Sequence, residues 1–171
     1  MSHRRNGVLS GEQLESLKPG DERLSRGPVA IVECIENIPC NPCVTACPKG
    51  AITIEGDLNN TPRVDSDRCD GCGICVSACP GLAIFVVDAS GDDSARVSLP
   101  FEFLPLPEVG DRVATLDRSG GTVGEGTVVR VLNSKALDRT PIVTIEIPVS
   151  DAMNVRHFRT SGAGGDERRG D

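Results

Sequence analysis

The feature that most constrains this chain is a block of eight cysteines, arranged as two similar sets between positions 34 and 79. The second set reads Cys69-x2-Cys72-x2-Cys75-x3-Cys79, with a proline after its last cysteine. An internal repeat of this kind predicts two similar halves, each built as strand, cysteine loop, short helical turn and strand. The spacing of the last three cysteines of the second set recurs in the first set, at Cys40, Cys43 and Cys47. Cys34 precedes these three.

The spacing of the second set indicates iron–sulfur chemistry. At this spacing, three thiolates on one loop reach three irons of a 4Fe–4S cube. The fourth cysteine points away, because the chain turns into a helix after Cys75. In two-cluster ferredoxins that fourth cysteine ligates the other cluster. Applied to this chain, the rule predicts two 4Fe–4S clusters: cluster 1 on Cys34, Cys40, Cys43 and Cys79, and cluster 2 on Cys69, Cys72, Cys75 and Cys47.

Two other uses of eight cysteines are disfavoured. Four disulfides need an oxidising compartment, and the opening MSHRRNG lacks the apolar stretch of a secretory signal. Zinc sites use two pairs of ligands and do not favour Cys-x2-Cys-x2-Cys-x3-Cys-Pro. One variation stays open: five residues separate Cys34 from Cys40 where the usual spacing has two, and without Cys34 cluster 1 is a three-iron species.

Composition excludes several classes of partner. The net charge of −7 argues against nucleic acid and against an anionic membrane surface. The longest apolar runs, Leu82–Val87 and Val128–Leu132, fall far short of the roughly 20 residues of a membrane span. With no Trp, no Tyr and four Phe, the core must rely on aliphatic residues or on a bound inorganic group. We therefore expect a cytoplasmic protein without membrane insertion.

The chain divides into four stretches by composition. We expect a polar N-terminal arm over 1–27, with a short helix after Ser10 that ends at Pro19-Gly20. The cysteine domain spans 28–89, a small polar link follows at 88–94, a β domain spans 95–159, and a disordered tail covers 160–171. The predicted fold class is α+β: a ferredoxin-like pseudo-twofold two-cluster domain followed by a small, mostly antiparallel, barrel-like β domain. The expected strands of the β domain are Arg96–Leu99, Arg112–Leu116, Thr127–Leu132 and Ile142–Ile147.

Residues 28–89 resemble a bacterial-type two-cluster ferredoxin, with the duplicated motif present at all eight cysteines. A broader resemblance rests on the segments GPVAIVECIENIPCNPCVTACPKGAI, CDGCGICVSACPGLAIFVVD and SLPFEFLPLPEVGDRVATLDR. These are similar to small iron–sulfur subunits of flavin-dependent amino-acid dehydrogenases, in complexes related to sarcosine oxidase and to proline or hydroxyproline dehydrogenase. The resemblance implies a hetero-oligomer in which this chain carries electrons away from flavin-containing subunits.

No catalytic residue is indicated. The glycine-rich run from Gly120 to Gly126 precedes no helix and is expected to be a hairpin turn, so there is no nucleotide fingerprint. His3 and His157 lack a nucleophile partner and are expected on the surface. We therefore expect a non-catalytic electron-transfer subunit, whose β domain either docks a partner or covers one cluster. A free-standing ferredoxin and an iron–sulfur regulatory protein are the alternatives.

Overall fold

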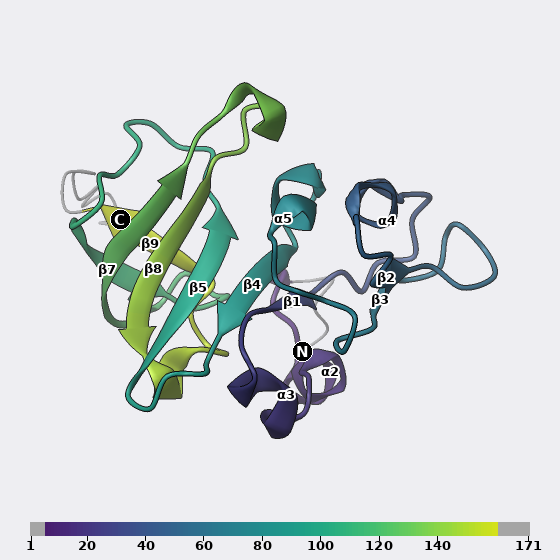
Figure 1. The fold of residues 1–171 in the computed structure, drawn as a ribbon, viewed down its shortest axis with the longest axis horizontal. Helices are drawn as coiled ribbons and strands as arrows, with labels where there is room; N and C mark the ends of the chain where they lie inside the picture. Colours follow the sequence, from purple (N-terminus) through teal and green to yellow (C-terminus); the bar gives the residue numbers. More distant parts are fainter. Residues whose placement is uncertain (1–5, 161–171) are drawn as a thin grey trace, which may run out of the picture.

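The computed structural model describes residues 6–160 (Figure 1). His3 and the tail beyond Thr160, which was expected to be disordered, lie outside the described residues. The architecture is a seven-stranded sheet with order β1-β4-β5-β8-β7-β6-β9 and a separate two-stranded sheet, β2-β3. The large sheet is made of β1 (Val29–Val32), β4 (Ile84–Asp88), β5 (Ser94–Pro100), β6 (Arg112–Leu116), β7 (Thr122–Leu132), β8 (Ile142–Pro148) and β9 (His157–Thr160).

All pairings in both sheets are antiparallel, as expected for the region after position 95. The four strands predicted there are confirmed as β5, β6, β7 and β8; β7 begins earlier than expected, at Thr122. The glycine-rich run lies in the turn between β6 and β7 and in β7 itself, in agreement with a hairpin. Short 3-10 turns follow β7 and β8, at Lys135–Leu137 and Val149–Asp151.

The cysteine region has the predicted repeat of strand, helical turn and strand. Each half contains one short helix, α4 (Pro42–Ala46) or α5 (Ile74–Ala78), and the two helices contact each other. The small sheet pairs β2 (Ile52–Thr53) with β3 (Arg63–Val64), while β1 pairs with β4. In Figure 1 these helices and the small sheet lie on one side of β4, and β5 to β8 lie on the other.

The expected link at 88–94 is a hairpin turn between two strands of one sheet. Strand β4 pairs with β5 through Asp88 opposite Arg96 and Val86 opposite Ser98. An open strand edge presents unpaired N–H and C=O groups, and β5 satisfies those of β4. The two regions therefore share a continuous sheet.

Strands β1 and β4 are buried on both faces. Because side chains alternate along a strand, Ile31 and Val87 point to one face while Val32 and Val86 point to the other. The first face joins the core of the β region, together with Val97, Val128 and Phe158. The second face joins a separate core with Ile52, Cys43 and Cys75. The antiparallel β1–β4 pair is thus a wall shared by the β region and the cysteine region, which explains the continuous apolar sequence of both strands.

A buried ion cluster joins the two ends of the large sheet. Glu33, just after β1, accepts hydrogen bonds from Arg118 at 2.6 and 2.8 Å and from Arg156 at 2.7 Å. Arg118 follows β6 and Arg156 precedes β9, so both arginines belong to the opposite end of the sheet. The guanidinium of Arg156 also lies over the Phe85 ring, 5.1 Å from its centroid. These contacts hold the sheet in a curled form.

The N-terminal arm is folded onto the chain. Helix α2 (Gly11–Leu17) begins at a capping box, in which Ser10 and Gln13 exchange side-chain and backbone hydrogen bonds. It ends before Pro19, as predicted. Helix α3 (Asp21–Ser25) follows and buries Leu24 in the core of the β region. Within residues 6–160, no helix is long and apolar enough to cross a membrane.

His157 is half-buried, so its predicted surface position is wrong. Its ring lies 5.9 Å from Phe101 and 5.5 Å from Phe103, and burial lowers its pKa. Phe101 in turn stacks on Phe158 with centroids 4.8 Å apart. No local pattern predicts this cluster, because its members come from opposite ends of the β region.

Candidate metal centre

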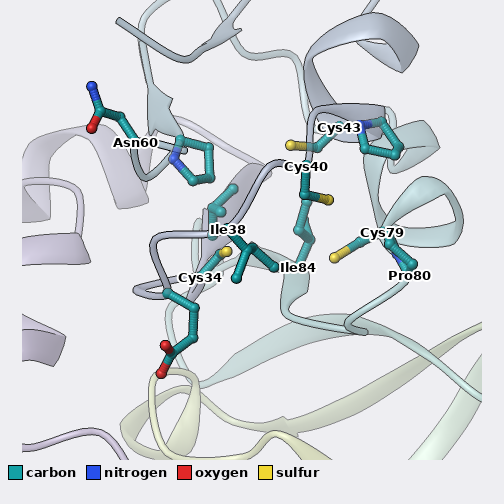
Figure 2. A pocket seen from close by; sticks show the side chains of 12 residues that line it. Cys34, Ile38, Cys40, Cys43, Asn60, Cys79, Pro80 and Ile84 are labelled. Atoms are coloured by element: carbon teal, nitrogen blue, oxygen red, sulfur yellow. The ribbon is translucent and has the colours of Figure 1, made fainter. Parts of the chain in front are cut away.

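Two partly open cavities lie beside the β1–β4 wall. The first is lined by Cys34, Cys40, Cys43 and Cys79, whose sulfurs surround a common space in Figure 2. Ile38, Pro80 and Ile84 add apolar surface to it. The second cavity is lined by Cys47, Cys69, Cys72 and Cys75, together with Ala30 and Ile52. The structure thus gathers the eight cysteines into the same two groups of four that the sequence predicts as ligand sets.

The two short helices explain how the fourth cysteine of each motif reaches the other cavity. Cys43 lies in α4 and faces the first cavity, whereas Cys47 caps the C-terminus of α4 and faces the second. In the same way, Cys75 in α5 faces the second cavity and Cys79 at its end faces the first. Residues i and i+4 of a continuous helix lie on one face, but Cys47 and Cys79 have extended backbone with ψ 108° and 110°, so the chain has left the helix and each side chain turns to the other cavity.

Backbone N–H groups point at three of the sulfurs. Ala51 donates to Cys47 at 3.3 Å, and Ala83 donates to Cys79 at 3.4 Å. Each of these alanines lies four residues after a cysteine followed by proline, so the repeat extends to the hydrogen bonds. Ala30 on β1 donates to Cys69 at 3.4 Å. Such donors stabilise negative charge on sulfur and tune an attached metal group.

The acidities of the thiols reflect burial and crowding. Burial, followed by the charges of Cys69, Cys72 and Cys47, raises the pKa of Cys75 to about 12. The pKa of Cys43 is also raised, first by burial and then by Cys79. Burial acts to raise the pKa of Cys47 too, but backbone N–H donors led by that of Ala51 outweigh it and lower the pKa. Metal binding needs thiolates, so it must release protons from these crowded groups.

The residues present fit two 4Fe–4S clusters. All eight cysteines are free thiols, four around each cavity. Among residues 6–160, no group of three or more His, Cys, Asp and Glu side chains is placed to hold a single metal ion. A cube takes one thiolate at each of four irons, so its ligands stand farther apart than those around one zinc.

Gly71 allows the second cysteine loop to pass close to the start of β1. Its φ is +68°, and a Cβ there would lie 2.5 Å from the Pro28 Cβ. We expect Gly71→Ala to cost more than the roughly 1–2 kcal/mol of a left-handed conformation alone, and to lower the iron content of the second cavity. Gly120→Ala is the matched control, because Gly120 has φ +82° but open space around its Cα. Iron content and denaturant unfolding of both variants test this, and equal losses would contradict a steric role for Gly71.

Sequence reasoning missed three groups around the cavities. The alanines that donate to Cys47 and Cys79 have a signal, since both cysteine motifs continue as Cys-Pro-x-x-Ala. The Glu33 ion cluster and the buried Arg23 have none, because their partners are distant in sequence.

Comparison with known proteins decides the family. Residues 33–83, which contain all eight cysteines, match the family described as a 4Fe-4S dicluster domain. The chain is also 37% identical over 67 residues to the pyruvate synthase subunit PorD of Methanocaldococcus jannaschii, covering 72% of that protein and 39% of this chain. The chain belongs to the 4Fe–4S dicluster family. An iron–sulfur, ferredoxin-type role in electron transport follows for this dicluster protein.

Other relatives of the dicluster protein are larger. The polyferredoxin-like subunit of the aliphatic sulfonate oxidoreductase of Pyrococcus furiosus is 39% identical over 54 residues, with 32% of this chain and 28% of the relative covered. The isethionate sulfite-lyase activating enzyme of Desulfovibrio desulfuricans is 43% identical over 67 residues, with 37% of this chain covered. The chain covers 21% of the length of that enzyme, and 8% and 17% of the lengths of two further relatives. No solved structure matches the dicluster protein significantly.

Proposed function

We propose that this protein is the electron-relay subunit of a multi-subunit, flavin-dependent amine or amino-acid dehydrogenase in the cytoplasm. Cys34, Cys40, Cys43 and Cys79 hold cluster 1, and Cys69, Cys72, Cys75 and Cys47 hold cluster 2. When bound, the clusters accept and donate single electrons. The observation that carries the proposal is the pair of four-cysteine cavities built on one wall of a larger sheet.

This chain's own residues hold the clusters and shield them. The apolar outer face of β1 and β4, with Val32 and Val86, separates the cavities from the β region and excludes water from that side. The N–H groups of Ala30, Ala51 and Ala83 supply hydrogen bonds to the sulfurs. The chain performs no organic chemistry itself, and the flavin-containing subunits do.

The β region supplies a surface for those partner subunits. The loop between β5 and β6 exposes three apolar side chains, with 63% of Phe103, 87% of Leu104 and 66% of Val109 accessible. Exposed apolar residues gathered on one loop are typical of protein–protein contacts. Electron transfer alone does not require this loop. Its presence therefore favours a subunit of a stable complex over a free-standing ferredoxin.

The test is anaerobic purification of the untagged protein from its own cells, with iron, sulfide and flavin assayed on whatever elutes together. We expect flavin-bearing subunits to elute with a chain that carries two clusters. We expect Leu104→Ser combined with Val109→Ser to lose the flavin subunits while the iron content stays unchanged. Val123→Ser, at an exposed apolar residue on β7, is the control and should keep them. A two-cluster chain that elutes alone would favour the free-standing ferredoxin, and a chain without iron would refute both.

A further inference from the structure

The buried guanidinium of Arg23 is not used by the ligand sets, although it lies beside cluster 2. Arg23 belongs to α3 and is only 9% exposed. Its N–H groups donate to four backbone carbonyls from two segments, 27–28 before β1 and 66–69, which ends on the predicted ligand Cys69. These are Ser66 at 2.6 Å, Cys69 at 2.8 Å, and Gly27 and Pro28 at 3.0 Å.

The positive charge of Arg23 has no direct counter-ion. Within residues 6–160, no carboxylate forms an ion pair with it, and its partners are all neutral carbonyls. Two acidic residues that line a surface pocket with Arg23 are engaged elsewhere: Asp67 pairs with Arg26 at 2.6 Å, and Asp70 pairs with Lys49 at 3.2 Å. Burial of an unpaired charge costs free energy. A residue whose only role was to bridge carbonyls would not need to be charged.

The two cavities differ in the charges around them. Near the first cavity, the buried arginines Arg118 and Arg156 share the carboxylate of Glu33, the residue before Cys34. The charged residue that lines this cavity is Glu36. The second cavity is lined by the paired Lys49 and Asp70, and Arg23 bonds the carbonyl of Cys69. Two arginines against one glutamate leave a net positive charge beside the first cavity too, so a buried cation lies near each cavity, and at the second it bonds the backbone of the ligand Cys69.

We propose that Arg23 is a positioning residue that fixes the Cys69 loop and raises the reduction potential of cluster 2. The inference rests on the proposed function, because it needs both clusters in place. Reduction adds a negative charge, and a nearby buried cation favours the reduced form. Coulomb interactions are stronger in the protein interior than in water, so one buried guanidinium outweighs exposed pairs. Removal of the Arg23 charge should therefore lower the potential of cluster 2 alone.

The experiment is a redox titration, followed by EPR, of the full-length protein carrying both clusters. In Arg23→Met we expect the potential of cluster 2 to fall and that of cluster 1 to stay, with cluster 2 identified as the transition that Cys72→Ala removes. The expected loss is about tenfold in the equilibrium constant for one-electron reduction, which corresponds to about 59 mV. Arg23→Lys keeps the charge and should keep most of the potential. Arg159→Met removes an exposed arginine on β9 and should change neither potential.

Iron and sulfide assays distinguish failure of the proposed function from failure of the role of Arg23. A wild-type protein without two clusters would refute the proposed function. A two-cluster wild type would instead refute only the role of Arg23 if Arg23→Met moved neither potential, moved the one that Cys72→Ala retains, or behaved like Arg23→Lys. Should Arg23→Met lose its clusters, Arg23→Gln, which removes the charge but keeps a hydrogen-bond donor, gives a second test. An unchanged potential of cluster 2 in Arg23→Gln would overturn the proposal.

Discussion

Replacement of Cys72 with alanine is expected to remove about half of the iron and sulfide from the protein, because each cluster needs all four thiolates. Cys72 is exposed, so the substitution leaves no cavity in the apolar core. Burial first, and then the charges of the neighbouring cysteines, raise the pKa of Cys75, so three thiolates without a cluster are disfavoured in the second cavity. Metal binding contributes directly to folding in small metal-binding domains, so the unfolding temperature should fall as well.

The control for Cys72→Ala is Ser77→Ala. Ser77 lies in α5, two residues after Cys75, and its hydroxyl donates within the helix to the carbonyl of Ile74. This variant should keep all of its iron. Cys40→Ala should repeat the loss of about half the iron, now from the first cavity. Full iron content in either cysteine variant would show that the ligand assignment is incorrect.

Replacement of Glu33 with alanine is expected to lower the free energy of unfolding by about 3–5 kcal/mol, because it leaves two buried guanidinium groups unpaired. The side chains of Glu33 and Arg156 are only 7% and 3% exposed. Burial opposes ionisation of Glu33, but hydrogen bonds and charges from Arg118 and Arg156 outweigh it and lower the pKa of its carboxyl. Loss of the carboxylate also frees the two ends of the sheet from each other.

Glu146→Ala is the matched control. It removes one carboxylate from the same sheet, but the ion pair of Glu146 with Arg96 is exposed and measures 3.3 Å. Exposed pairs contribute about 0–1 kcal/mol, so this variant should be close to wild type. Anaerobic denaturant unfolding of both variants gives the comparison. Similar losses from the two substitutions would contradict a structural role for the buried ion cluster.

Much of the site was predictable because metal-ligand spacing is local. Cys-x2-Cys-x2-Cys fixes how three thiolates on one loop can be placed, and the repeated Cys-Pro motif indicates where each short helix ends. The same holds for strands such as β6, whose bounds are those predicted, and for the helix that starts after Ser10. Each of these features depends on residues a few positions apart.

The sequence indicated a division at 88–94, where small polar residues follow an apolar strand. The structure has one sheet there, because the unpaired edge of β4 is completed by β5. The apolar run in β4 indicated burial on both faces, but it did not show that one face packs on the β region and the other on the cysteines. Which elements cover a strand depends on the whole topology.

By itself, the sequence determined that this protein has two four-cysteine sets suited to iron–sulfur clusters and a mostly antiparallel β region. Only the tertiary structure decided which charges are buried next to them. Glu33 and Arg156 are separated by 123 positions, and Arg23 and Cys69 by 46. Such pairings have no local pattern, because they form only when the sheet curls and α3 packs beside the second cavity.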